Sequence, residues 1–171
     1  MDNPEILDPL VREAVSAIDA TVREARAGDR EFVLAAVERL AGFPLPPWRT
    51  PPEVVAGDAR TLRRFLDSGQ AGSTLLVAET AEGSPLGFVF LETEKDYFTQ
   101  TRHGHIGIVA VTQEAEGKGV GRVLMRAAEA WAREQGFAKL TLSVFENNHH
   151  ARRVYEHVGY SPETLRYVKI L

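Results

Sequence analysis

The stretch from Glu116 to Arg122 combines glycines and basic side chains in a pattern that suits phosphate binding. It reads Glu-Gly-Lys-Gly-Val-Gly-Arg. The apolar run 106–111 predicts a strand before it, and apolar residues at helical spacing from Val120 to Trp131 predict an amphipathic helix after it. Glycines let a backbone approach a ligand closely, and the free N–H groups of a first helical turn attract anions. The turn is therefore predicted to bind a phosphate group, most simply a diphosphate.

The spacing of this turn argues against two familiar nucleotide-binding loops. Lys118 is followed by Gly119 and Val120, so the hydroxyl that a P-loop places on magnesium is missing. Gly117, Gly119 and Gly121 form Gly-x-Gly-x-Gly, one residue short of the dinucleotide-binding fingerprint. A glycine-rich turn that binds no ligand is the remaining alternative, although three glycines at a helix start lower helix stability.

A second block of residues narrows the choice of ligand. Two residues separate Asn148 from Ala151, and two residues separate Tyr155-Glu156 from Gly159-Tyr160. Together with the glycine turn, this block resembles the GNAT superfamily of acetyl-CoA-dependent N-acetyltransferases, and the resemblance runs from about Ala20 to the C-terminus. It implies a mixed α/β fold, with a central, mostly antiparallel twisted sheet and helices on both faces.

The resemblance also implies which residues hold acetyl-CoA. The main chain before the turn would pair with the pantetheine amides, the turn would bind the diphosphate, and the start of the last helix would complete the site. The residues are Val109, Ala110, Val111, Glu116, Gly117, Lys118, Gly119, Val120, Gly121, Arg122, Asn148, Ala151 and Tyr155. Glu116 departs from the family, which usually has Gln or Arg there. Its carboxylate would repel a diphosphate unless it points away, and Lys118 and Arg122 are candidates to supply the positive charge.

Catalysis of acetyl transfer to an amine requires a base for the ammonium group and an acid for the departing thiolate. Tyr155 matches the family tyrosine near the coenzyme sulfur, and a phenol is protonated at neutral pH. For the base, His105 stands at the start of the strand that leads to the turn, and Glu92 lies on the neighbouring strand. Glu94 and His103 are weaker candidates. For each of these residues a structural or solvent-exposed role is the alternative.

Other side chains allow more than one interpretation. Asn148 is expected either to cap the last helix or to bind the pantetheine arm. Glu92, Glu94 and Asp96 would form an acidic mouth that attracts amines, while three aromatic residues are candidates to line the acceptor pocket, Trp48, Tyr97 and Phe98. No metal site is expected, because His149 and His150 are adjacent and helical metal sites favour i,i+4 spacing.

Composition limits the classes of function. The chain has 171 residues, 44% hydrophobic content and a formal net charge of −4, which gives no support for nucleic-acid binding. It has no cysteine, so an acyl group cannot pause on a protein thiol and direct transfer is the simpler mechanism. No apolar run approaches the length of a membrane span and the acidic start is unlike a signal peptide, so a cytoplasmic protein is expected.

The remaining patterns predict the elements around the site. Residues 1–19 are interpreted as an N-terminal extension and 20–171 as the acetyltransferase domain. Strands are predicted over 21–24, 75–79, 86–92 with continuation toward 94, 139–144 and 165–170. Asp29 is a candidate N-cap for a helix to Leu40, five prolines predict a stiff irregular loop over 42–52, and a short helix is expected over 59–67.

Taken together, these observations predict an N-acetyltransferase that moves an acetyl group from acetyl-CoA directly to a primary amine of a small molecule, peptide or protein. The alternative is a catalytically weak acyl-CoA sensor or interaction module with the same fold, which Glu116 keeps open. The family resemblance also allows a homodimer.

Overall fold

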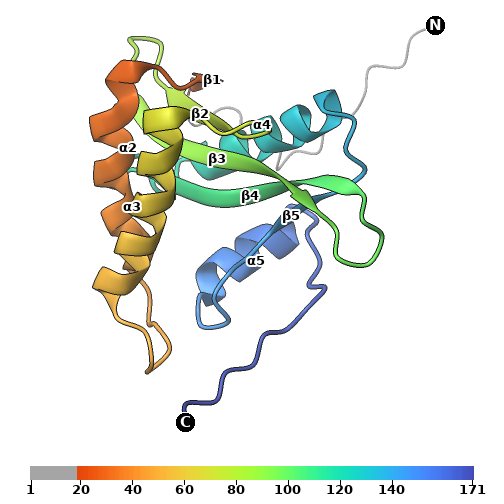
Figure 1. The fold of residues 1–171 in the computed structure, drawn as a ribbon. Coiled ribbons are helices and arrows are strands. Elements are labelled where there is room, and N and C mark those ends of the chain that lie inside the picture. Colours follow the sequence, from red (N-terminus) through yellow and green to blue (C-terminus); the bar gives the residue numbers. More distant parts are fainter. Residues whose placement is uncertain (1–18) are drawn as a thin grey trace, which may run out of the picture.

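A five-stranded sheet forms the centre of the protein in the computed structural model, which describes residues 19–171 (Figure 1). The strands follow chain order, β1-β2-β3-β4-β5. Neighbours are antiparallel from β1 to β4, and β5 is parallel to β4. This confirms the predicted mixed, mostly antiparallel sheet. The predicted extension 1–19 lies, except for residue 19, outside the described residues.

Each element has defined bounds. The strands are β1 (Thr21–Glu24), β2 (Thr74–Glu79), β3 (Pro85–Lys95), β4 (Arg102–Val111) and β5 (Leu140–Leu142). The α-helices are α2 (Arg30–Ala36), α3 (Pro51–Ser68), α4 (Val120–Glu134) and α5 (His149–His157). Short 3-10 helices are η1 (Ala27–Asp29), η2 (Val37–Ala41) and η3 (Gln113–Ala115).

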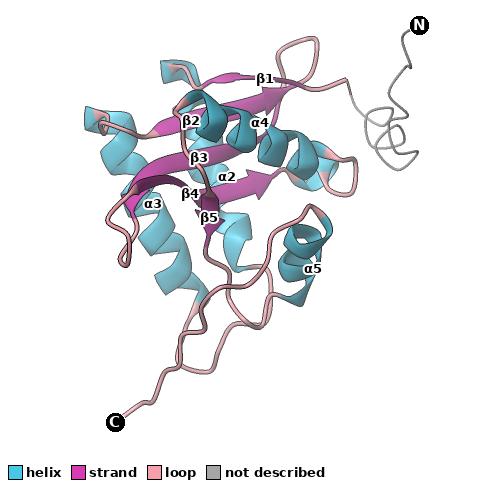
Figure 2. Ribbon diagram, turned by 90° about the vertical axis from the view of Figure 1, so that its right-hand side faces the viewer, coloured by secondary structure: helices cyan, strands magenta, loops and turns pink. Residues whose placement is uncertain are grey.

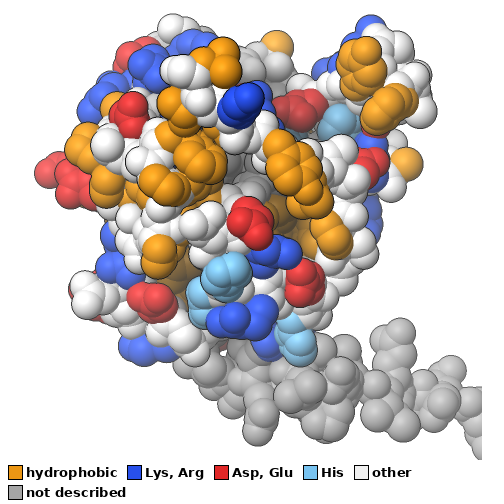
Figure 3. Space-filling model, turned by 90° about the horizontal axis from the view of Figure 1, so that it is seen from below, with side chains coloured by type: hydrophobic (Ala, Val, Ile, Leu, Met, Phe, Trp, Pro, Cys, Tyr) orange, Lys and Arg blue, Asp and Glu red, His pale blue; other side chains and the backbone are white. Residues whose placement is uncertain are grey.

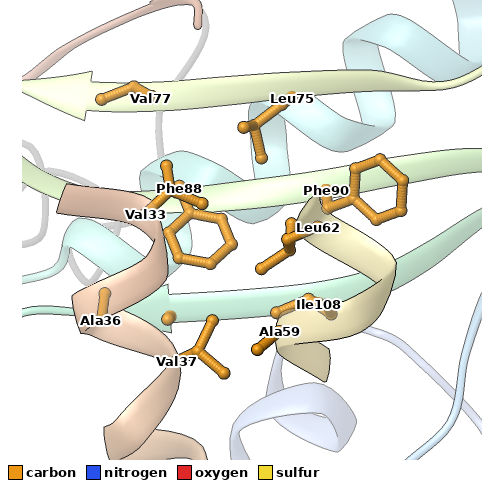
Figure 4. Packing of buried hydrophobic residues seen from close by; sticks show 11 residues of the cluster. Val33, Ala36, Val37, Ala59, Leu62, Leu75, Val77, Phe88, Phe90 and Ile108 are labelled. Carbon is orange, nitrogen blue, oxygen red and sulfur yellow. The ribbon is translucent and has the colours of Figure 1, made fainter. Parts of the chain in front are cut away.

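Helices cover both faces of the sheet, as predicted (Figure 2). On one face, α2, η2 and α3 pack on alternate residues of β2, β3 and β4, with Phe88 and Phe90 at the centre (Figure 4). On the other face, α4 packs on Val89, Leu91 and Ile106 through its own apolar side. Because neighbouring strand residues point to opposite faces, β3 contributes to both clusters and is buried from Gly87 to Leu91. Because both faces of the sheet are packed against helices, its strands hold the residues at its edges in fixed positions.

The proline-rich segment differs from the prediction at its end. The loop was expected to extend to Pro52 and the helix to cover only 59–67, but α3 begins at Pro51 and runs for 18 residues. Proline is tolerated in the first helical turn because the N–H groups there need no intrahelical partner. Thr50 caps the helix in a capping box, in which its backbone N–H donates to Glu53 at 2.8 Å.

The C-terminal part also differs from the prediction. The strand predicted over 139–144 is shorter, because β5 pairs with β4 only over Leu140–Leu142. The strand predicted over 165–170 is wrong: residues 160–171 have no regular structure, and the side chains of Leu165, Tyr167 and Ile170 are exposed. Alternating apolar residues become a strand only where a partner strand accepts their backbone hydrogen bonds, and this segment pairs with no described strand.

Asp29 occupies the N-cap position of α2, but its side chain caps a different turn. The carboxylate accepts the backbone N–H of Arg26 at 2.6 Å and pairs with the Arg23 guanidinium at 2.7 Å. Arg23 also pairs with Glu79 of β2 at 2.8 Å. The hydrogen bond from Arg23 holds the pKa of Asp29 below its ordinary value. This network ties the start of the described chain to the sheet.

Among the described helices, none has both the length and the apolar character needed to cross a membrane.

The Asp29 network can be tested by Asp29→Asn. Because Arg23 and the N–H of Arg26 lose a charged acceptor at a buried position, we expect the free energy of unfolding at pH 7 to fall by about 1–3 kcal/mol. The folded-state pKa of Asp29 is lowered, so its contribution is complete above about pH 4 and is lost as the pH falls through the folded pKa. The difference between wild type and variant in denaturant titrations should therefore shrink on acidification.

Asp67→Asn, which breaks an exposed pair with Arg30, is the control and should cost less than about 1 kcal/mol. Equal losses from both variants would contradict this account.

Candidate active site

The glycine turn links β4 to α4 through η3, at the position predicted from the sequence. Gly117 and Gly119 have positive φ angles of 73° and 85°, in the left-handed region that favours glycine. Gly119 is the N-cap residue of α4. Gly121 lies within the helix, and a Cβ there would meet only ordinary contact with Val111 at 3.9 Å. The backbone conformation of the turn therefore requires glycine at positions 117 and 119. At Gly121 the absence of a side chain only leaves space beside the helix.

Main-chain N–H groups accumulate at the start of α4. The first backbone hydrogen bond of this helix runs from Val123 N to Gly119 O at 3.2 Å, and no side chain caps the helix. Within residues 19–171, this leaves the N–H groups of five residues without a hydrogen-bond partner, namely Gly117, Gly119, Val120, Gly121 and Arg122. They stand at the positive end of the dipole of a 15-residue helix, so the arrangement fits the oxygens of a diphosphate.

The edge of β4 beside the turn is open. Gly104 N donates to Lys139 O of the β5 segment at 3.2 Å, but the pairing of β4 with β5 ends at Ile106. Gly107 is then an extra residue in β4, because Leu91 pairs with Ile106 and Phe90 with Ile108. This bulge changes which peptide groups face β3.

After the bulge, Thr112 N donates to Leu86 O of the β3 side at 2.9 Å. By alternation, the peptide groups of Val109 and Val111 point away from β3, toward the side that β5 no longer fills. Their side chains pack, half-buried, against the cluster under α4, whereas Ala110 is buried on the opposite face. The side chains of this stretch therefore belong to the core, while its main chain is free to add a ligand as a further strand.

Glu116 points to a partner in the protein. Its carboxylate accepts the Arg39 guanidinium of η2 at 2.9 Å, and 64% of the Glu116 side chain is exposed. Arg39 also contacts Gln113 at 3.5 Å. Neither Lys118 nor Arg122 forms an ion pair with a described residue. The negative charge beside the turn is thus compensated by Arg39, and the charges of the two other basic residues are available.

Helix α5 carries the second predicted block. Asn148 caps this helix through its side-chain oxygen, which accepts the N–H of Ala151 at 3.1 Å. Of the two alternatives left open for Asn148, capping is observed for the oxygen. Tyr155 is half-buried and packs against the cluster under α4, with its ring 6.2 Å from the ring of Tyr160. Burial raises the pKa of the Tyr155 phenol.

The phenol of Tyr155 is available for chemistry. Its hydroxyl makes no hydrogen bond with a described residue and is not among the buried atoms without a partner, so the described part of the chain leaves it accessible. The hydroxyl of Tyr160, in contrast, is fully buried without a described partner, and burial raises its pKa to about 12. A solvent-accessible phenol with a raised pKa keeps its proton at neutral pH and can donate it.

The predicted base candidates gather on one face of β3 and β4. Glu92 lies directly opposite His105 in the strand register, and Glu94 lies opposite His103. His105 Nδ1 is 2.8 Å from the hydroxyl of Thr141 in β5 and 3.6 Å from the Glu94 carboxylate. His103 is buried, with Nδ1 unpartnered among the described residues. The structure therefore brings Glu92, Glu94 and His105 together, and places His103 beside Glu94 at 3.8 Å with only 8% of its side chain exposed.

A missing side chain makes room for Glu92. A Cβ at Gly107 would lie 2.9 Å from Glu92 Oε2, so the carboxylate rests over the glycine of the bulge. Its other oxygen accepts the Gln70 amide at 3.4 Å. The bulge that opens the edge of β4 thus also accommodates this carboxylate.

Asp96 does not belong to the predicted acidic mouth. Its carboxylate is buried and accepts hydrogen bonds from the Lys139 ammonium group and from the backbone N–H groups of Phe98 and Thr99. The hydrogen bond from Lys139 holds the Asp96 pKa well below its ordinary value. The carboxylate instead stabilises the β3–β4 loop, on which Tyr97 and Phe98 are 84% and 79% exposed. Trp48 is 43% exposed on the proline-rich loop, so whether these aromatic residues line an acceptor pocket stays a prediction.

Seen from below, hydrophobic side chains surround a hollow in the surface, with histidine and basic side chains beneath it in the view (Figure 3). Helix α5 lies on this lower side of the molecule (Figure 1). Residues 19–171 contain no group of three or more side chains placed to hold a metal ion.

Three contacts at the site were not foreseen from the sequence. Arg39 faces Glu116 across 77 positions of sequence, and Gln70 and Thr141 contact Glu92 and His105. In the sequence, Thr141 stands out only as a polar residue in the alternating pattern of 139–144. This pattern predicts which face of the strand Thr141 is on, but not that it contacts His105.

Comparison with known proteins agrees with this geometry. Residues 34–160 match the model of the acetyltransferase (GNAT) family. Mycothiol acetyltransferase of Rhodococcus erythropolis is 29% identical over 103 residues, which cover 60% of this chain and 34% of the relative. Streptothricin acetyltransferase of Streptomyces lavendulae is 35% identical over 91 residues, 53% of this chain and 46% of the relative. The chain thus spans between a third and a half of the length of these two relatives.

Solved structures share the fold. A protein of Pyrococcus furiosus aligns over 89% of this chain and 99% of its own, with 26% identity and a TM-score of 0.72. The family match covers most of the chain and includes the open edge of β4, the glycine turn and the start of α5. The protein is a member of the GNAT acetyltransferase family.

Proposed function

We propose that this protein is an N-acetyltransferase that transfers the acetyl group of acetyl-CoA directly to a primary amine. One observation carries the proposal: unpartnered main-chain N–H groups converge at the start of α4, beside the open edge of β4. Together they fit the two parts of the coenzyme that a protein main chain can recognise, the diphosphate and the pantetheine amides.

The coenzyme supplies an activated thioester, and this chain supplies position and proton transfer. The N–H groups of Gly117 and of the residues from Gly119 to Arg122 bind the diphosphate, with the side chains of Lys118 and Arg122 adding charge. The peptide groups of Val109 and Val111 orient the pantetheine arm along β4. Asn148 and Ala151 hold the start of α5, which positions Tyr155. Tyr155 donates its phenolic proton to the sulfur that leaves with the electron pair of the broken carbon–sulfur bond.

Glu92 and His105 serve the acceptor. An alkyl ammonium has a pKa of about 10.4, so the attacking nitrogen must lose a proton before its lone pair can form the bond to the acetyl carbon. Glu92 and Glu94 attract the cation, and His105 or Glu92 accepts the proton. The absence of cysteine supports direct transfer over a thiol-bound intermediate. The names of the relatives, which include mycothiol and streptothricin acetyltransferases, support a small-molecule acceptor.

Coenzyme binding is tested by calorimetry with acetyl-CoA on wild type, Gly117→Ala and Gly136→Ala. Both glycines have nearly the same φ, 73° and 74°, and a Cβ at either would meet nothing within 4 Å. Both variants should therefore lose about 1 kcal/mol of stability through backbone strain. Only Gly117→Ala should weaken acetyl-CoA binding, by about tenfold, because Gly136 lies at the far end of α4. Equal affinity of the two variants would contradict the assigned turn, and Gly119→Trp, which fills it, should abolish binding.

The compensation of Glu116 predicts opposite effects of two substitutions on coenzyme affinity. Arg39→Ala frees the Glu116 carboxylate beside the diphosphate, so acetyl-CoA should bind about threefold to tenfold more weakly at low salt. Glu116→Gln removes the negative charge and should tighten binding. In the double variant the loss caused by Arg39→Ala should disappear. A loss that persists in the double variant would show that Arg39 acts without Glu116.

Turnover is tested by measuring thiol release from acetyl-CoA with a panel of primary amines. We expect at least one small amine to be acetylated. Tyr155→Phe should lower kcat by about 10²-fold, in the range typical of a general acid, with little change in coenzyme affinity. Tyr167→Phe, an exposed tyrosine in the irregular C-terminal segment, is the control and should leave the kcat unchanged. Coenzyme binding without release from any amine would favour the alternative, an acyl-CoA sensor.

A further inference from the structure

The hydrogen-bond partners of His105 determine which of its two ring nitrogens can act as a base. In a neutral imidazole one nitrogen carries a hydrogen and the other has a free lone pair, and the neighbouring groups select between the two tautomers. For His105 both neighbours of interest lie at Nδ1, namely the Thr141 hydroxyl at 2.8 Å and the Glu94 carboxylate at 3.6 Å.

Thr141 is placed to accept a hydrogen bond from Nδ1. Its own hydroxyl hydrogen is directed to the backbone oxygen of Gly104, 3.3 Å away, so the oxygen presents a lone pair to His105. The Glu94 carboxylate, on the other strand, can only accept. The acceptor at hydrogen-bond distance and the nearby carboxylate both favour the tautomer with hydrogen on Nδ1, and the lone pair then lies on Nε2.

Nε2 of His105 is open to a ligand. It makes no hydrogen bond with a described residue, and it is not among the buried atoms without a partner in residues 19–171, unlike Nδ1 of His103, so the described part of the chain leaves it accessible. The groups that face this imidazole come from three strands: Glu92 and Glu94 from β3, His103 from β4 and Thr141 from β5. A cation that approaches Nε2 therefore meets carboxylates on the same face of the sheet.

We propose that Thr141 is a positioning residue that holds His105 with hydrogen on Nδ1, so that the Nε2 lone pair accepts the proton of the acceptor's ammonium group; this rests on the proposed function. The nitrogen–hydrogen bond of the ammonium breaks and its electron pair stays on the amine. The Nε2 lone pair forms the new bond to that proton, and the ring gains the positive charge next to Glu94. The imidazolium then returns the proton to solvent.

The test reads the tautomer directly. Protein labelled with 15N-histidine is examined by long-range proton–nitrogen NMR without acceptor, and His105→Gln identifies the resonances of His105. We expect a protonated Nδ1 and an unprotonated Nε2 in the neutral ring. A protonated Nε2 in wild-type protein would overturn the proposal whether or not acetylation is detected.

Three variants separate the hydroxyl from a general effect of substitution. Thr141→Val removes the acceptor and should shift His105 toward the other tautomer, with kcat falling by about threefold to tenfold because fewer molecules carry the lone pair on Nε2. Thr141→Ser should retain both the nitrogen shifts and the kcat. Thr93→Val is the control, since Thr93 donates to the Gly72 carbonyl at 2.7 Å and lies on the opposite face of the sheet.

The outcomes are distinct. Unchanged nitrogen shifts in Thr141→Val would refute the positioning role, and changed shifts with an unchanged kcat would refute the role of Nε2 in turnover. Absence of turnover with every amine would overturn the proposed function and the base assignment with it, while the nitrogen shifts would still decide the hydrogen bond.

Discussion

The change of neighbour along β4 is the constraint on which the rest of the site depends. Up to Ile106 this strand has β3 on one side and β5 on the other, and beyond it the β5 side is open. The extra residue at Gly107 reverses the alternation of peptide groups, so that Val109 and Val111 direct theirs to the open side. Without the bulge, the peptide groups at these two positions would be used by β3, and the main chain would have nothing to offer a ligand.

The same bulge connects the proposed coenzyme side of the site with the proposed acceptor side. Gly107 lacks a side chain, and the Glu92 carboxylate occupies the space above it. His105 stands two residues earlier, on the paired part of β4, where β5 still supplies Thr141. The base candidates therefore lie where β4 is paired on both sides. The peptide groups that are free to bind a ligand lie where β4 is paired on one side only. The separation between these two regions is therefore only a few residues along β4.

Sequence reasoning succeeded where the signal is local. The glycine turn, the strand before it and the long helix after it depend on residues within a few positions of each other, and they occur where predicted. The Asn148 cap of α5 is also local, and it is one of the two alternatives that the sequence left open. It was wrong where the outcome depends on a distant partner. Alternating residues at 165–170 form no strand, and Asp96 serves Lys139 and its own loop in place of an acidic mouth. Arg39 compensates Glu116 from 77 positions away, which no spacing rule could indicate.

The partner of each carboxylate decides whether its negative charge is compensated. Asp29, Asp96 and Glu116 are all bound to basic side chains of the protein, so their charges are compensated. Glu92 accepts a hydrogen bond from the neutral amide of Gln70, and the Glu94 carboxylate lies 3.6 and 3.8 Å from ring nitrogens of His105 and His103 without a hydrogen bond. The negative charge that remains on this face is therefore concentrated beside His105, whereas the free N–H groups and Lys118 make the turn positive. This separation fits the proposed function, in which a cationic amine and an anionic coenzyme bind at different places before a direct transfer between them.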